Sequence, residues 1–111
     1  MRKLFVNLEN IVGTAYWEFA SGSWDKKTYR CTDSIYIHDG DIFHSDFFDI
    51  VLDIIPECDP LGETKISKEQ WKQICEKAIL GGGHSAQIVY AAEPWIIKNF
   101  QKHDVFYILG V

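Results

Sequence analysis

The densest group of chemically reactive side chains lies in the stretch HSDFFDIVLDIIPECDP, residues 44–60. Asp46, Asp49 and Asp53 recur there at spacings of three and four, which places their carboxylates on one face of a helix. Glu57 and Asp59 follow just past the apolar run. Carboxylates at this density suit three roles: acid–base catalysis, metal binding, or docking of a basic partner.

The negative charge of the chain is confined to its middle. Residues 1–32 carry five basic and three acidic side chains, residues 64–111 carry six and four, and each part therefore has a net charge of +2. Residues 33–63 contain no Lys or Arg and have a net charge of −9. Their acidic residues are Asp33, Asp39, Asp41, Asp46, Asp49, Asp53, Glu57, Asp59 and Glu63. This field repels phosphate backbones and attracts basic surfaces, so we expect a basic protein partner and no direct nucleic-acid binding.

Acid–base catalysis is disfavoured by the spacing of the three aspartates. A catalytic carboxylate pair needs two differently buried environments that separate the two pKa values. Asp46, Asp49 and Asp53 instead share the polar side of the predicted helix, opposite its apolar side. The pattern favours a solvated acidic face that also serves as a docking surface.

A metal site is a weaker alternative. An EF-hand loop counted from Asp39 fails, because the sixth position holds His44 instead of Gly. His38, Asp39, His44 and Asp46 could together ligate a transition metal in a metal-dependent enzyme or module, but no HExxH or HxxxH spacing supports that set. No metal or cofactor is therefore assigned.

Nucleophilic and phosphate-binding motifs are also missing. The Gly-rich residues 81–85 follow a predicted helix rather than a strand and match no phosphate loop. No GxSxG elbow is present. Cys31, Cys58 and Cys75 are odd in number and form no CxxC pair, which argues against disulfides and structural zinc and favours a reducing cytoplasm. The sequence thus favours an interaction protein over an enzyme.

Strands are expected in the first part of the chain. Residues 3–8, 13–20 and 28–43 are rich in apolar, aromatic or β-branched side chains. The HDGD sequence predicts a tight hairpin between residues 35–37 and 42–43.

Helical periodicity begins after this segment. Ser45 is a candidate cap for a helix that ends before Pro56. Its expected apolar stripe is Phe47, Phe48, Val51, Leu52 and Ile55. A loop, PECDPLGET, separates it from a second helix, for which Ser67 and Gln70 form a capping box.

The second helix is expected to end at the three glycines of residues 81–83. Its predicted apolar stripe is Trp71, Ile74, Cys75, Ala78 and Ile79. Ser85 can begin a third helix, and Pro94 can open a further helical segment. The final run, DVFYILGV, predicts a central strand that returns to the N-terminal sheet.

Together these elements predict a single α+β domain over residues 1–111, with a mostly antiparallel sheet packed against two to four helices. The basic start MRKLFVNLEN has only a short apolar run, so we expect neither a signal peptide nor a transit peptide. No apolar run approaches the roughly 18 residues of a membrane span.

Aromatic residues are numerous in the strand region, and some must reach the surface because neighbouring residues of a strand point to opposite faces. Trp24, in the polar stretch SGSWDKK, is the predicted exposed anchor for a partner. Packing over a hairpin end is the alternative for its side chain.

In size, α+β pattern, local acidity and lack of catalytic motifs, the chain resembles the immunity proteins of bacterial contact-dependent growth inhibition and related polymorphic toxin systems. The resemblance implies that the chain binds a cognate toxin domain, commonly a basic nuclease, and blocks its active site or substrate groove. The expected partner-binding residues are Trp24, Asp39, Asp41, Asp46, Asp49, Asp53, Glu57, Asp59 and Glu63. A regulatory subunit that binds another basic protein is the remaining alternative.

Overall fold

A computed structural model of the chain describes residues 4–11, 13–27, 30–59 and 62–110. Five strands form one antiparallel sheet with the order β1-β3-β2-β5-β4. In chain order the elements are β1 (Phe5–Val6), the 3₁₀ helix η1 (Leu8–Asn10), β2 (Tyr16–Ala20), β3 (Ile35–His38), α1 (Asp39–Phe43), α2 (Phe47–Ile54), β4 (Glu63–Ser67), α3 (Lys68–Gly81), α4 (Gly83–Lys102) and β5 (Val105–Leu109). The predicted α+β fold with an antiparallel sheet is confirmed.

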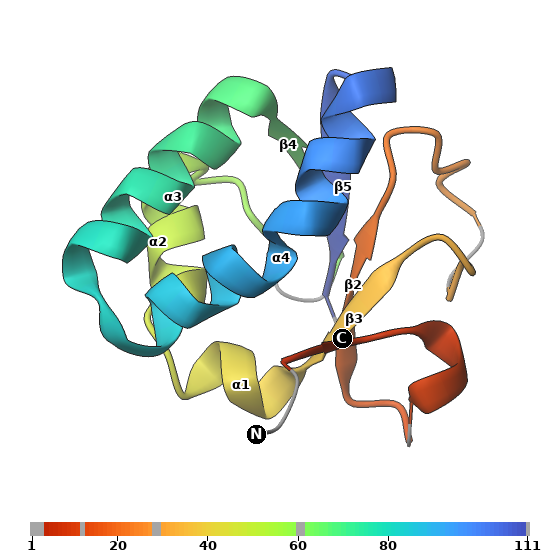
Figure 1. Ribbon diagram of the computed structural model, residues 1–111, viewed down its shortest axis with the longest axis horizontal. Helices are drawn as coiled ribbons and strands as arrows, with labels where there is room; N and C mark the ends of the chain where they lie inside the picture. The colour runs from red at the N-terminus through yellow and green to blue at the C-terminus, as the bar shows by residue number, and fades with distance from the viewer. Residues whose placement is uncertain (1–3, 12, 28–29, 60–61, 111) are drawn as a thin grey trace.

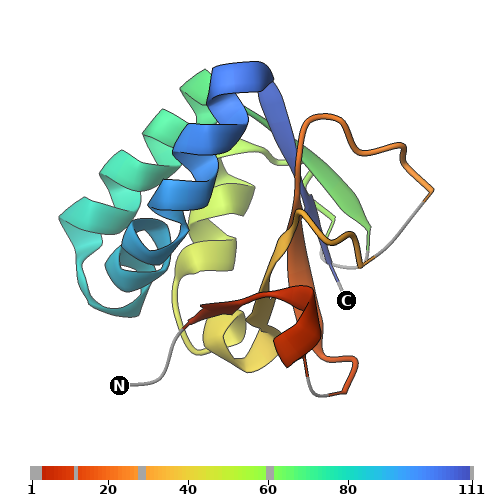
Figure 2. The same cartoon turned by 45° about the vertical axis from the view of Figure 1, so that its right-hand side comes forward.

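The helices α2, α3 and α4 lie together on one side of the sheet (Figures 1 and 2). Strand β5 pairs with β2 and β4, which confirms that the last strand is interior and returns to the N-terminal strands. Phe19 of β2 is fully buried between the two layers. Its ring lies 5.0–6.4 Å, centroid to centroid, from those of Phe5, Phe47, Trp71, Trp95 and Phe106.

The opposite face of the sheet is covered by the connection between β2 and β3. Glu18 is 4% exposed, and its carboxylate accepts hydrogen bonds from the backbone N–H groups of Arg30 (2.7 Å) and Cys31 (3.0 Å). The hydroxyl of Ser34 donates a third bond at 2.6 Å. These three bonds fasten the connection to the strand and hold Arg30 at a positive φ of 60°.

Tyr36 adds to this polar cluster, since its hydroxyl donates to the carbonyl of Cys31 at 2.5 Å. Burial and, to a lesser extent, the charge of Glu18 raise the pKa of Tyr36. Trp24 packs on the same face, with its ring centroid 5.2 Å from that of Tyr107. The prediction of an exposed Trp24 is therefore wrong and its packing alternative is confirmed, because only 9% of the residue is exposed.

The predicted hairpin at HDGD is wrong: β3 ends at His38 and α1 begins at Asp39. The imidazole Nδ1 of His38 accepts the N–H of Gly40 at 3.0 Å, which caps a helix in place of a turn. Both edges of β3 are already paired, one with β1 and one with β2. The other predicted strands are shortened to the bounds given above. Of the residues in the predicted strands and loop, Lys3, residues 28–29, residues 60–61 and Val111 lie outside the described residues.

Strand β4 was missed because its first residues were assigned to a loop. It pairs with β5 over five residues, burying Thr64 and Ile66 and exposing Glu63 and Lys65. The cap that follows is confirmed: the hydroxyl of Ser67 accepts the N–H of Gln70, and the Gln70 side chain accepts the N–H of Ser67.

Residues 83–102 form one continuous helix, so the expected break before Pro94 is wrong. Pro94 is exposed, and water can hydrate the carbonyl that its missing N–H leaves unpaired. The glycine stop is confirmed, since α3 ends at Gly81 and Gly82 has a φ of 69°.

Three further details of the helices differ from expectation. Leu52 and Ile79 are 38% and 45% exposed, so neither belongs to a buried stripe. Asp46, and not Ser45, is the N-cap residue of α2. The hydroxyl of Ser45 nevertheless accepts the N–H of Phe47 at 3.1 Å.

Replacing Glu18 by Gln is expected to lower the free energy of unfolding by about 2–3 kcal/mol, because an amide presents one acceptor oxygen to three donors and loses the charge. Denaturant unfolding monitored by Trp fluorescence measures this change. The exposed Glu9→Gln variant is the matched control and should remain within about 0.5 kcal/mol of the parent. Equal stability of the two variants would contradict the role of the Glu18 carboxylate.

Candidate functional site

The acidic segment, defined as residues 33–63, contains β3, α1, α2, the connection to β4 and the start of β4. In Figure 1, α1 lies at the bottom of the molecule, and α2 lies beside α3 in the helical layer. Asp39 and Asp41 are half-buried. The exposed carboxylates are Asp33, Asp46, Asp49, Asp53, Glu57, Asp59 and Glu63. The predicted solvent exposure of the three aspartates on α2 is confirmed.

Two neighbouring helices fix the position of α2. The backbone N–H of Asp46 donates to the hydroxyl of Ser85 on α4 at 3.0 Å. Lys77 of α3 forms an ion pair with Asp53, and both side chains are at least half exposed. An exposed pair of this kind contributes about 0–1 kcal/mol, so it orients Asp53 more than it stabilises the fold.

The acidic segment also carries exposed apolar side chains. Phe43 is 55% exposed and Leu52 is 38% exposed. The Phe43 ring contacts the Trp17 ring edge-on, with centroids 5.8 Å apart. This contact with a buried side chain helps to fix the orientation of Phe43. Phe43 and Leu52 are thus exposed apolar side chains among carboxylates, whereas Trp24, the predicted exposed aromatic, is buried.

The residues of the metal alternative do not assemble into a ligand set. The Nδ1 atom of His38 lies 3.3 Å from a carboxylate oxygen of Asp39 and accepts the N–H of Gly40. Among the described residues, no group of three or more His, Cys, Asp or Glu side chains could hold a metal ion. His44 and Asp46 therefore do not complete a site with this pair.

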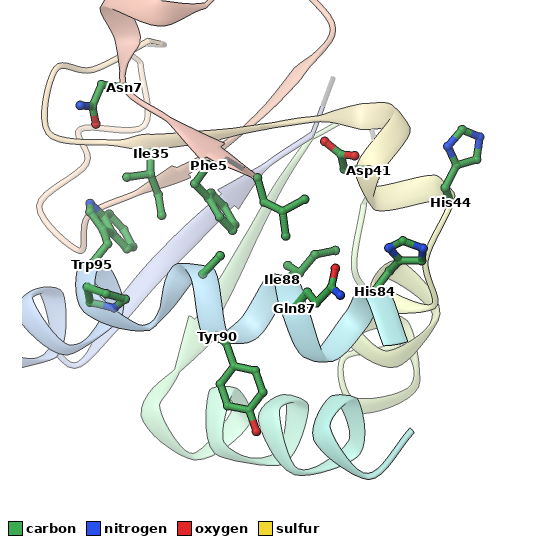
Figure 3. Close-up of a pocket in the computed structure, with 13 residues that line it drawn as sticks. Phe5, Asn7, Ile35, Asp41, His44, His84, Gln87, Ile88, Tyr90 and Trp95 are labelled. Atoms are coloured by element: carbon green, nitrogen blue, oxygen red, sulfur yellow. The ribbon is translucent and has the colours of Figure 1, made fainter. Parts of the chain in front are cut away.

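A groove lies between α4 and strand β1, with α1 at one end (Figure 3). Its volume is about 1180 Å³. The described residues that line it are Leu4, Phe5, Asn7, Ile35, Asp41, His44, His84, Gln87, Ile88, Tyr90, Ala91, Pro94 and Trp95. Sequence patterns did not indicate this groove, because its walls come from segments about 90 residues apart.

One wall of the groove is held rigidly. The indole N–H of Trp95 donates to the backbone carbonyl of Asp33 at 2.8 Å. The Trp95 ring also contacts Phe19 and Phe106 edge-on. The ring is thus held from both the sheet and the β2–β3 connection.

The side chains that could act as nucleophiles, Ser85 and the three cysteines, are buried or partly buried. Ser85 is 5% exposed and its hydroxyl accepts the Asp46 N–H, so little of this hydroxyl is open to a substrate. Burial raises the pKa of the thiols of Cys31 and Cys58. For Cys75, burial and then the charges of Glu93 and Glu76 raise the pKa to about 11.

Comparison with known proteins found no matching family model, no matching curated protein and no matching solved structure. Within the described residues, none of the helices has the length and apolar character needed to cross a membrane.

Alkylation of Cys75 by iodoacetamide at pH 8 is expected to be roughly a hundredfold slower in the folded chain than in the unfolded chain, because the raised pKa removes the thiolate. A variant that keeps Cys75 as its only cysteine, followed by mass spectrometry with and without denaturant, isolates this rate. A rate in the folded state close to that of the unfolded chain would contradict the raised pKa.

Proposed function

We propose that the chain is an immunity protein that binds a cognate toxin domain and neutralises it by covering its active site or substrate groove. The toxin is a basic protein, most simply a nuclease. The chain acts in the cytoplasm, where such a toxin meets its substrate. It performs no catalysis of its own.

The observation that carries this proposal is the exposure of seven carboxylates on a segment that contains no Lys or Arg. A nuclease must present Lys and Arg side chains to hold phosphate groups. The acidic segment offers such a surface the opposite charge. The same field repels nucleic acid, so the chain would bind the toxin and not the nucleic acid on which the toxin acts.

Charge and apolar contact would have separate roles in the complex. Complementary fields raise association rates towards about 10⁸ M⁻¹s⁻¹ at low salt, whereas charges at the rim add little affinity. Affinity depends on a few apolar anchors at the centre of an interface of about 1,600 Å². Phe43 and Leu52 are exposed among the carboxylates and suit that role.

The direct test is calorimetry of the purified chain with the C-terminal domain of the protein encoded immediately upstream. We expect one-to-one binding with a Kd of about 10 nM or tighter, together with loss of the partner's nuclease or growth-inhibiting activity. No heat and no protection would refute the proposal for that partner. Binding without protection would favour the alternative of a regulatory subunit for a basic protein.

Replacing Asp46, Asp49 and Asp53 together by Asn is expected to slow association about tenfold at low ionic strength and to flatten its salt dependence, because steering depends on the field of these carboxylates. Stopped-flow association rates at several salt concentrations measure the effect.

The matched control replaces three exposed carboxylates outside the acidic segment, Glu76, Glu93 and Asp104, by their amides. It changes the net charge equally and should slow association less. If the association rate is unchanged in the α2 variant, or is equally slow in both variants, α2 is not part of the interface.

A further inference from the structure

We propose that the outer edge of β4 pairs with the same edge of a second copy of this chain, so that two molecules share one continuous antiparallel sheet. In this pairing Thr64 lies opposite Thr64 of the second copy, and each Glu63 lies opposite a Lys65. The interface goes beyond the proposed function, because the partner is another copy of the chain and not the toxin.

Strand β4 is at the end of the sheet that the described residues form. It pairs with β5 on one side, and the strand order places no described strand on its other side. The side chains of Glu63 and Lys65 are exposed, whereas those of Thr64 and Ile66 are buried. An unpaired edge of this kind presents backbone N–H and C=O groups to a further strand.

The register with β5 decides which backbone groups of β4 face this edge. The N–H of Gly110 donates to the carbonyl of Gly62 at 2.8 Å, so these two opposite residues form a hydrogen-bonded pair. Such pairs recur at every second residue of an antiparallel ladder, so the backbone groups of Thr64 face β5. Those of Glu63 and Lys65 therefore point away from β5, and none of the described residues bonds to them.

The available groups and their charges select one register. The N–H of Ser67 already donates to the Gln70 side chain at 2.9 Å, which leaves Glu63 and Lys65 as the pairing residues. Two copies can place Glu63 opposite Glu63, Lys65 opposite Lys65, or Glu63 opposite Lys65. The first two arrangements put like charges directly across from each other, which destabilises a strand pair, whereas the third forms two pairs of opposite charge.

The backbone geometry agrees with the third arrangement. Each Glu63–Lys65 pair exchanges two N–H···O bonds, and a two-fold axis passes between the Thr64 residues. An axis perpendicular to the sheet keeps the buried faces of both β4 strands on the same side. The occupant is a second copy because β4 itself supplies both charges at the spacing that self-pairing needs.

The strength of this dimer is limited by its size. Each molecule contributes one strand of five residues, and contacts of this size belong to the weak class of interfaces. Sedimentation equilibrium of the parent chain should show a monomer–dimer equilibrium with a Kd of about 0.1 mM. A chain that remains monomeric up to about 1 mM overturns the proposal.

Reversing the two charges singly and together identifies the interface. Lys65→Glu and Glu63→Lys each put like charges opposite each other and should weaken dimerisation about tenfold. The variant that carries both substitutions restores two pairs of opposite charge and should dimerise within about threefold of the parent. The control is Lys98→Glu at an exposed position of α4, the helix that borders the opposite edge of the sheet. It changes the net charge as Lys65→Glu does and should leave the Kd within about threefold of the parent.

An isotope-filtered NOE measurement on a mixture of labelled and unlabelled parent chain tests the register directly. We expect a contact between the α-protons of the two Thr64 residues, because opposite residues of a non-hydrogen-bonded pair have Cα atoms about 4.5 Å apart. A dimer that lacks this contact, or whose Kd does not respond to the charge reversals, uses another surface and overturns the assignment.

The NOE measurement needs no substitution, so it decides even if a variant does not fold. The toxin takes no part in these experiments. Their failure therefore leaves the proposed function unaffected, and failure of the calorimetry leaves this interface unaffected.

Discussion

Burial of Phe19 is the constraint on which the arrangement of the molecule depends. Its ring meets aromatic side chains from β1, α2, α3, α4 and β5, so the elements that cover the sheet converge on one residue of its central strand. Each aromatic pair contributes about 0.5–1.5 kcal/mol beyond area burial. Because Phe47 binds α2 to this cluster, the opposite side of α2, with Asp49 and Asp53, must face solvent. The acidic surface is thus a consequence of the aromatic core.

Successive side chains of β2 point to opposite faces of the sheet, so this strand contacts both the core and the second face. Glu18, next to Phe19, points to the other side and holds the β2–β3 connection through three hydrogen bonds. Near the end of that connection lies Asp33, whose carbonyl accepts the indole N–H of Trp95. A polar cluster on one side of the sheet therefore positions a wall of the groove on the other side.

The surface that results is acidic, with apolar side chains among the carboxylates. The acidic segment presents exposed carboxylates with Phe43 and Leu52 among them, and the groove begins at Asp41 on the same segment. The hydroxyl of Ser85 instead accepts a bond that ties α4 to α2, and burial raises the pKa of the Cys75 thiol. The Ser85 hydroxyl is therefore buried and hydrogen-bonded, whereas the carboxylates of Asp46, Asp49 and Asp53 are exposed.

The sequence by itself determined the features that depend on residues within about one helical turn: the Ser67–Gln70 capping box, the glycine stop after α3 and the block of negative charge. Only the tertiary structure decided the rest. Strand β4 is a strand because β5 offers it a partner, and Trp24, despite its polar neighbours, is buried because Tyr107 lies beneath it. The groove joins Phe5 to Trp95. Such pairings are set by contacts between segments far apart in the chain, and local spacing carries no information about them.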